Sequence, residues 1–255
     1  MDISERKRQR TDSTFHRHPW EIARGHIIID LLRTAGNFPP DHIVDVGSGD
    51  GYIAGMLVGA GAARTYTAID TAMDPGLAAS LQKEIPQARF FTDLAAAGRQ
   101  IPAADVILLL DVIEHVENDT ALLTSIGDNI ALAPDAKWII TVPAFQSLFS
   151  RHDTILGHYR RYTLARLTRT CRAGRLAVKK KGYFFFSLFL LRMLTRRKET
   201  GSTATHGVQD WKGGRRLTSF LVGLLWMDYK IGRIINKLGL NIPGLSCYCI
   251  CHRLP

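Results

Sequence analysis

The residues best suited to chemistry begin with a glycine-rich turn in the first fifth of the chain. A β-branched apolar run from Ile43 to Val46, which includes an aspartate, is followed by Gly47, Gly49 and Gly51 at alternate positions. This pattern predicts a buried strand, a tight turn and the start of a helix. Glycines allow close approach of backbone to ligand, and free N–H groups at a helix start can face that ligand. We therefore expect a nucleotide-like cofactor at this turn.

The spacing of the glycines distinguishes between cofactors. The dinucleotide pattern G-x-G-x-x-G/A needs a small residue where Tyr52 stands, and the chain has no G-x-x-x-x-G-K-[ST] phosphate loop. The pattern D-x-G-x-G-x-G instead resembles the first motif of class I S-adenosylmethionine (SAM) methyltransferases. The resemblance implies SAM as cofactor and S-adenosyl-L-homocysteine as product. It also implies cofactor contacts by Asp45, Gly47, Ser48, Gly49, Gly51 and Tyr52. A glycine turn that holds no ligand is the alternative.

Acidic residues at the ends of the next expected strands extend this site. Asp70 ends the run that starts at Thr65, and a carboxylate at this point can accept hydrogen bonds from both ribose hydroxyls. The alternative is an aspartate that only opens a turn. By the resemblance, Asp70 and Thr71 contact the ribose region, and Asp93 and Leu94 hold the adenine.

The segment Asp111-Val112-Ile113-Glu114-His115 follows an apolar run typical of a parallel strand buried on both faces. It resembles the D-V-x-E-H segment of small-molecule methyltransferases, including those of ubiquinone biosynthesis, and implies that Asp111 and Val112 contact the cofactor. The tetrapeptide N-P-P-Y or D-P-P-Y, which is common in enzymes that methylate exocyclic amino groups of nucleic-acid bases, is absent here.

A polar segment from Val142 to Thr163 supplies the candidate catalytic groups. It resembles the V-P-A…H…G-H-x-R-R-Y-T block of a broad group of bacterial class I methyltransferases (the methyltransferase type 11/12 group). Histidine titrates near neutral pH and can remove a proton from an acceptor. We predict His158, then His152, then His115 as the base. For each histidine, a structural hydrogen bond is the alternative.

The same segment also offers groups that could bind an acceptor. The predicted substrate-binding residues are Tyr159, Arg160, Arg161 and Trp20. Arg160 and Arg161 suit an anionic group, or else they pair with acidic residues of the chain itself. Trp20 and Arg24 lie on an expected helix that leads into the first strand, so they are candidate lid residues, and core packing is the alternative for Trp20.

These residues require a fold that brings strand ends together. We expect an α/β, Rossmann-like, doubly wound sheet of seven strands, six parallel and the last antiparallel, with a helical hairpin insertion near the C-terminus. Helices are predicted at 20–35, 52–59 and 121–133, and the fifth strand at 138–144. The apolar run 183–191 is predicted as a helix that is buried or in lipid, and 217–238 as a second helix.

This pattern divides the chain into four parts. Residues 1–14 form a mobile basic tail, and 15–182 the SAM-binding core. Residues 183–240 form an apolar and basic helical insertion, which includes a linker at about 199–214 and which acts as a lid, a membrane-facing element or a dimer element. Residues 241–255 hold the last core strand.

Composition limits the classes of function. Residues 1–150 carry 12 Lys and Arg against 19 Asp and Glu, whereas residues 151–255 carry 21 against 4. The basic part therefore suits an anionic substrate, a membrane surface or a nucleic acid. No apolar run is long enough to span a membrane, so we expect a cytoplasmic protein, with peripheral contact at the inner face of the membrane as an alternative. Cys247, Cys249 and Cys251 are expected as buried thiols on one strand face rather than metal ligands, and we expect no metal site.

The leading hypothesis is a SAM-dependent methyltransferase (EC 2.1.1 type) acting on a small or lipophilic acceptor at oxygen, either a hydroxyl or a carboxylate, as a monomer or homodimer. One alternative is an RNA or DNA methyltransferase that uses its basic C-terminal part for phosphate contacts. Another is a non-catalytic methyltransferase-fold binding subunit.

Overall fold

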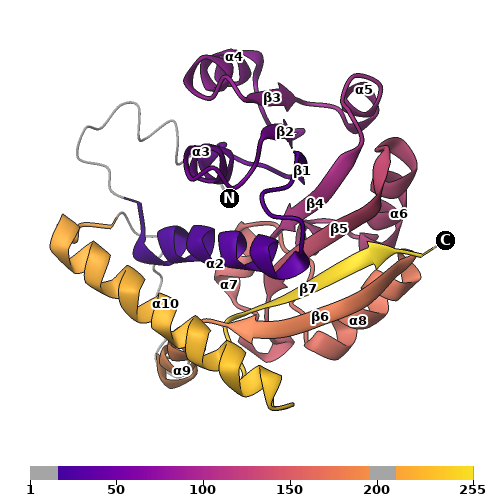
Figure 1. The fold of residues 1–255 in the computed structure, drawn as a ribbon. Helices are drawn as coiled ribbons and strands as arrows, with labels where there is room; N and C mark the ends of the chain where they lie inside the picture. Colours follow the sequence, from indigo (N-terminus) through magenta and orange to yellow (C-terminus); the bar gives the residue numbers. More distant parts are fainter. Residues whose placement is uncertain (1–16, 196–210, 255) are drawn as a thin grey trace.

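A seven-stranded mixed sheet organises the computed structural model, which describes residues 17–195 and 211–254 (Figure 1). The strand order is β3-β2-β1-β4-β5-β7-β6, and β7 runs antiparallel to both of its neighbours. This confirms the expected mixed, Rossmann-like sheet. The strands are β1 (His42–Val46), β2 (Thr65–Ile69), β3 (Ala88–Phe91), β4 (Ala104–Leu110), β5 (Leu132–Pro143), β6 (Leu176–Phe184) and β7 (Ser246–Arg253).

Helices cover both faces of the sheet. The first face packs against α2 (Pro19–Ala35), α3 (Tyr52–Gly59), α4 (Pro75–Glu84) and α10 (Arg215–Lys237). The second face packs against α5 (Leu94–Gly98), α6 (Asp119–Asn129) and α8 (Leu164–Ala173). Side chains of β1 alternate between the two cores, with Ile43 in one and Val44 and Val46 in the other, as the two-residue period of a strand requires. Short helices η1 (Ile113–His115), η2 (Gln146–Leu148) and α7 (Arg151–Ile155) and helix α9 (Phe186–Thr195) complete the described elements.

The prediction for the region before β5 was wrong at its boundary. The expected helix 121–133 ends at Asn129, and β5 begins at Leu132 rather than at Trp138. Ile130 already has extended backbone dihedrals, and Leu132 pairs with Ala104. The register shifts between Ala104 and Val106, and this irregularity accommodates Pro134, which cannot donate a hydrogen bond to a regular ladder.

The apolar run 183–191 was also interpreted incorrectly as one helix. Tyr183 and Phe184 end β6, where they pair with Cys247 and Ser246 of β7. Phe185 has a positive φ of 66°, which interrupts the chain direction, and α9 starts at Phe186. The proposed boundary at residue 183 therefore falls inside a core strand. Helix α9 has no fully buried residue, so its apolar side chains are not enclosed by the described parts of the protein.

Helix α10 lies along α2 and is held there by one buried carboxylate (Figure 1). Asp30 of α2 accepts a hydrogen bond from the Tyr229 hydroxyl at 2.8 Å and pairs with Lys230 at 2.8 Å and with Arg233. The carboxylate thus fixes one face of α10 against the core. None of the described helices combines the length and apolar character needed to cross a bilayer.

The cysteine prediction is confirmed for β7. Cys247, Cys249 and Cys251 are buried in the second core together with Cys171, and all four are free thiols. The expected tail at 1–14 and most of the linker expected at about 199–214 lie outside the described residues.

Candidate active site

The glycine turn lies at the carboxyl end of β1, where the strand order reverses between β1 and β4. Gly47, Gly49 and Gly51 have φ values of 79°, 59° and 74°, a region that favours glycine. A Cβ on Gly47 would lie 2.5 Å from the side chain of Val112, so the turn after β1 is packed tightly against the loop after β4. Gly51 caps α3, which begins at Tyr52. The structure thus brings the predicted loop residues and Val112 together.

Asp70 is joined directly to this turn. One oxygen of its carboxylate accepts a hydrogen bond from the Gly49 N–H at 2.7 Å, and the other accepts from the Ala72 N–H at 2.9 Å. Because a carboxylate offers about four lone-pair sites, both oxygens keep capacity for further donors. Thr71 is exposed beside it. The geometry thus positions Asp70 at the turn and leaves acceptor capacity there.

Asp45 is the buried acid beneath the turn. Its Oδ2 accepts a hydrogen bond from the Tyr66 hydroxyl at 2.6 Å. Its Oδ1 is buried without a hydrogen-bond partner within residues 17–195 and 211–254. Burial raises the pKa of Asp45 to about 6, while the Tyr66 hydrogen bond opposes that rise. An unpartnered buried acceptor is costly to the protein alone, so it suits a ligand that donates a hydrogen bond or carries positive charge.

Asp111 occupies the corresponding position after β4. It has a φ of 56°, which is uncommon for a residue other than glycine and is typical of functional sites. Its carboxylate pairs with Arg24 at 2.8 Å and accepts a hydrogen bond from the Thr141 hydroxyl at 3.1 Å. Arg24 is buried in α2 and also donates to Thr141 at 3.3 Å. The arginine therefore holds a positive charge against the acidic edge of the sheet.

The chain before α2 also reaches the turn. Arg17 pairs with Asp50 inside the glycine turn, and its guanidinium lies 4.0 Å from the centre of the Tyr52 ring. Sequence reasoning missed Arg17 and Asp50, because no motif marks an arginine so far from the turn in sequence. Trp20 is half-buried and packs against the first core, so its role toward a substrate stays a prediction.

Asp93 and Leu94 lie at the end of β3. Asp93 is exposed and caps α5, with its carboxylate accepting the Ala96 N–H at 2.6 Å. Leu94 packs against the second core. Both are at the edge where ligands bind in such sheets, and their adenine contacts stay predictions.

Two of the three candidate bases come together. The rings of His115 and His158 are 4.5 Å apart between centroids, in an edge-to-face arrangement. Nδ1 of His158 is 2.9 Å from Oδ1 of Asp153, a fully buried carboxylate that also binds Arg161 through two hydrogen bonds. Burial raises the pKa of Asp153, but the hydrogen bonds from His158 and Arg161 outweigh it and keep that pKa well below its usual value. An ionised Asp153 can therefore fix the orientation of His158.

Glu114 lies next to this pair. It was not predicted as a site residue, although it stands in the D-V-x-E-H segment. Its side chain is fully buried, and neither carboxylate oxygen has a hydrogen-bond partner within the described chain. Burial, with a smaller contribution from Asp111, raises the pKa of Glu114 well above its ordinary value. Its backbone carbonyl accepts the Tyr159 N–H at 2.8 Å, which ties the two site segments together.

The other predicted groups of this segment have different surroundings. His152 is half-buried on α7, and burial lowers its pKa. Tyr159 is exposed. Arg160 pairs with Asp119 at 3.1 Å and donates to the Glu117 carbonyl at 2.6 Å. Both arginines thus have partners within the protein, as the alternative interpretation expected, and their substrate contacts stay predictions.

An aromatic cluster extends the site toward α9. Phe145, directly after β5, has a positive φ of 61° and stacks on Tyr183 at 5.1 Å between ring centres. Phe189 of α9 lies 5.2 Å away from it in a tilted arrangement. Sequence reasoning missed Phe145 because nothing in the pattern separates it from a core residue.

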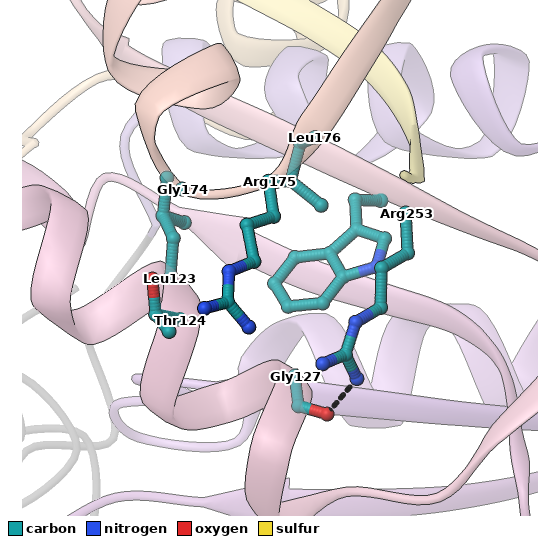
Figure 2. Close-up of a pocket in the computed structure, with 8 residues that line it drawn as sticks. Leu123, Thr124, Gly127, Gly174, Arg175, Leu176 and Arg253 are labelled. Atoms are coloured by element: carbon teal, nitrogen blue, oxygen red, sulfur yellow. Dashed lines mark hydrogen bonds between the residues drawn. The ribbon is translucent and has the colours of Figure 1, made fainter. Parts of the chain in front are cut away.

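A separate hollow lies at the opposite edge of the sheet, where β6 begins (Figure 2). Leu123 and Gly127 of α6, Gly174 and Leu176 surround it, and Arg253 reaches across to donate to the Gly127 carbonyl. None of the predicted site residues lines this hollow.

The comparisons with known proteins concern the family and the fold of the chain. A family model described as a methyltransferase domain matches residues 20–216. No curated protein matches the chain by sequence.

Solved structures share the fold at low sequence identity. A candidate sarcosine dimethylglycine methyltransferase from Galdieria sulphuraria has a TM-score of 0.55 and 11% identity, covering 91% of this chain and 86% of that one. The N-methyltransferase NodS from Bradyrhizobium japonicum has a TM-score of 0.51 and 12% identity, covering 93% and 98%. A chain from the complex of the Haloferax volcanii Trm112 methyltransferase activator with a candidate methyltransferase has a TM-score of 0.51 and 13% identity, covering 91% and 94%.

Proposed function

The chain belongs to the methyltransferase domain family and is a SAM-dependent methyltransferase, and we propose that it methylates a small or lipophilic acceptor at an oxygen atom. The observation that carries the proposed acceptor class is the exposed apolar stripe of α10, described below. The proposed attack by oxygen is supported by the His158–Asp153 pair, which can take a hydroxyl proton.

The residues around the turn fit SAM. When bound, SAM supplies a methyl group on a positively charged sulfonium. Asp70 keeps acceptor capacity for ribose hydroxyls, and Asp45 has a buried oxygen without a partner for a cationic or donor group. Arg24 adds a buried guanidinium that can face a carboxylate. This donor set matches a ligand that carries hydroxyls, an amino group and a carboxylate.

His158 is the proposed base. Asp153 holds its Nδ1, which leaves Nε2 to accept the proton of an acceptor hydroxyl. As that proton leaves, the acceptor oxygen forms a bond to the methyl carbon, and the electron pair of the carbon–sulfur bond stays on sulfur. The protein otherwise has to align the reacting atoms, which is the main requirement of such a displacement.

The apolar stripe of α10 supports a lipophilic acceptor. Its members follow alternating spacings of three and four residues along the exposed side of the helix, and Phe220 and Ile234 are 67% and 62% exposed. The stripe consists of Leu217, Phe220, Leu224, Met227, Ile231, Ile234 and Leu238. A continuous exposed apolar surface of this kind typically marks an interaction site.

Charge favours an anionic membrane surface over a second copy of the chain. Helix α10 carries five Lys and Arg residues and a single acid, Asp228. Lys230 and Arg233 pair with Asp30 of α2, whereas Arg215, Arg216 and Lys237 are exposed to a surrounding surface. Two such helices would repel each other, whereas an anionic bilayer attracts basic residues beside an apolar face. We therefore propose that α9 and the exposed side of α10 face a membrane, that the protein is cytoplasmic and peripheral at the inner face, and that the acceptor is reached there. Phe189 of α9 touches Phe145 at the candidate site, which supports this route.

Vesicle binding tests the membrane part. The protein should sediment with vesicles that contain about one third phosphatidylglycerol. Added salt should release the protein from the vesicles, because salt screens the attraction between surface charges. Phe220→Gln and Ile234→Gln should each weaken binding. Ile155→Gln, which changes a 55% exposed residue off the stripe, should not. Equal binding to neutral vesicles, or equal loss in the control, would contradict the proposal.

Acceptor screening tests the chemistry. With SAM, lipophilic phenols and carboxylic acids should release S-adenosyl-L-homocysteine, and mass spectrometry should find the methyl group on oxygen. If amines or RNA are methylated and phenols and carboxylic acids are not, the proposed acceptor class is wrong.

The nucleic-acid alternative is weakened by ion pairs within the protein. Arg160, Arg161 and Arg233 each pair with an internal acid, which reduces the basic surface available to a nucleic acid.

A further inference from the structure

Glu114, His115 and His158 form a compact group of metal-ligating side chains. One ligand atom from each residue lies within 4.8 Å of the other two. Two imidazoles and one carboxylate form a ligand set used by catalytic zinc sites and other transition-metal sites. The group lies at the carboxyl edge of the sheet, and the exposure of His115 leaves it open to solvent.

The buried carboxylate is the observation that points independently to a ligand. Glu114 is 0% exposed, and both of its oxygens are without a partner in the described structure. Leaving such acceptors unsatisfied is unfavourable, because burial removes their hydrogen bonds to water and nothing replaces them. A cation between Glu114 and the two imidazoles would satisfy these oxygens. No hydrogen bond from another residue of the described chain reaches them.

His158 is already oriented as metal-binding histidines usually are. A ligating imidazole typically donates its second N–H to a carboxylate or a backbone carbonyl. His158 places Nδ1 2.9 Å from Asp153, so Nε2 is its remaining ligand atom. The outer partner Asp153 is thus built into the fold before any cation arrives.

We propose that Glu114, His115 and His158 bind one divalent transition-metal cation of the zinc class, which leaves at least one coordination position for an oxygen of the acceptor. This deepens the proposed function and rests on it for the role of the cation. With the cation bound, Nε2 of His158 would be a ligand and would no longer serve as the base proposed above; the cation would instead lower the pKa of the acceptor hydroxyl, whose proton would pass to water. The acceptor is then one with an ionisable, metal-binding oxygen, such as a phenol.

Metal binding can be measured without methyl transfer. The full chain, stripped with a chelator and dialysed, is titrated with Co²⁺ and followed by its visible absorption, and then with Zn²⁺ in competition. We expect one Co²⁺ per chain, with the strong bands of a four- or five-coordinate site. Glu114→Gln and His115→Asn should each weaken binding by at least tenfold, because each removes a direct ligand. His26→Asn changes an exposed histidine of α2 and serves as the matched control.

The outcomes separate this inference from the proposed function. Absence of one-to-one binding, or binding that Glu114→Gln and His115→Asn leave unchanged, overturns the metal site. His115 is exposed, so its variant should keep the fold even where Glu114→Gln does not. SAM affinity is measured on the same samples in excess chelator. Loss of metal binding with SAM binding intact removes only the metal site, whereas absence of SAM binding removes the cofactor assignment on which the proposed function depends.

Discussion

Replacement of Asp70 by alanine tests the contact that joins the glycine turn to the second strand. The carboxylate of Asp70 bridges the Gly49 and Ala72 N–H groups, and we propose that it also accepts hydrogen bonds from the ribose hydroxyls of SAM. Asp70→Ala removes the acceptor for those hydroxyls and also the hydrogen bond that the Gly49 N–H of the turn donates to this carboxylate. We therefore expect SAM affinity to fall while the protein stays folded.

The size of the loss follows from the number of hydrogen bonds. A hydrogen bond to a charged group contributes about 1.5–3 kcal/mol. Asp70 is half-buried, so the lower value applies to each of two hydroxyls, giving about 3 kcal/mol. Because 1.4 kcal/mol is a factor of ten, the dissociation constant should rise by somewhat more than 100-fold.

Isothermal titration calorimetry with SAM measures this change, and Asp74→Ala is the matched control. Asp74 caps α4 through the Leu77 N–H at 2.8 Å, so its loss should cost about 1 kcal/mol of stability with no change in SAM affinity. An Asp70→Ala protein that binds SAM within threefold of wild type would refute the ribose role and support the simple turn interpretation.

Three further predictions concern the acid, the turn and the helix pair. SAM affinity should fall by up to tenfold per pH unit as the pH drops below about 6, because Asp45 is then protonated and neutral. Calorimetry at several pH values should show this loss in the wild-type protein and not in Asp45→Asn. Gly47→Ala should cost on the order of 1–3 kcal/mol of unfolding free energy in urea, because φ is 79° and the new Cβ meets Val112; an unchanged midpoint would contradict that geometry. Asp30→Ala should cost on the order of 2 kcal/mol and expose α10 to proteolysis, since Tyr229 loses its buried acceptor, and unchanged protease resistance would show that other contacts hold α10.

The sequence predicted the elements that follow strong local rules. Glycines at alternate positions after an apolar run located the turn, and Tyr52 to Gly59 has the predicted helix bounds. The acidic strand ends Asp70 and Asp111 were placed at the same edge because parallel strands share it. These inferences needed only the period of strands and the backbone freedom of glycine.

The start of β5 and the end of β6 could not be predicted from local patterns, because they depend on how the strands pair with their neighbours. Pro134 favoured a helix end and a turn, yet the strand begins before it because a register shift opposite Ala104 absorbs the irregularity. Tyr183 and Phe184 have the same apolar character as the helix that follows, and only their pairing with β7 places them in a strand.

Site residues brought from a distance were harder to predict than those in motifs. Arg17 reaches Asp50 across 33 positions, and no spacing rule links the two. The partner of Arg24 is Asp111, which depends on how α2 crosses the sheet. Glu114 was visible in its motif, but its importance comes from complete burial without a partner, which only three-dimensional packing reveals.

The central claim is that the glycine turn of this chain holds SAM, and the most direct test is the ligand content and SAM affinity of the purified protein. Mass spectrometry of the denatured protein and calorimetry of the folded protein measure the two quantities. We expect co-purified SAM or S-adenosyl-L-homocysteine, or stoichiometric binding of added SAM that Asp70→Ala weakens. A folded protein that neither carries nor binds SAM would contradict it.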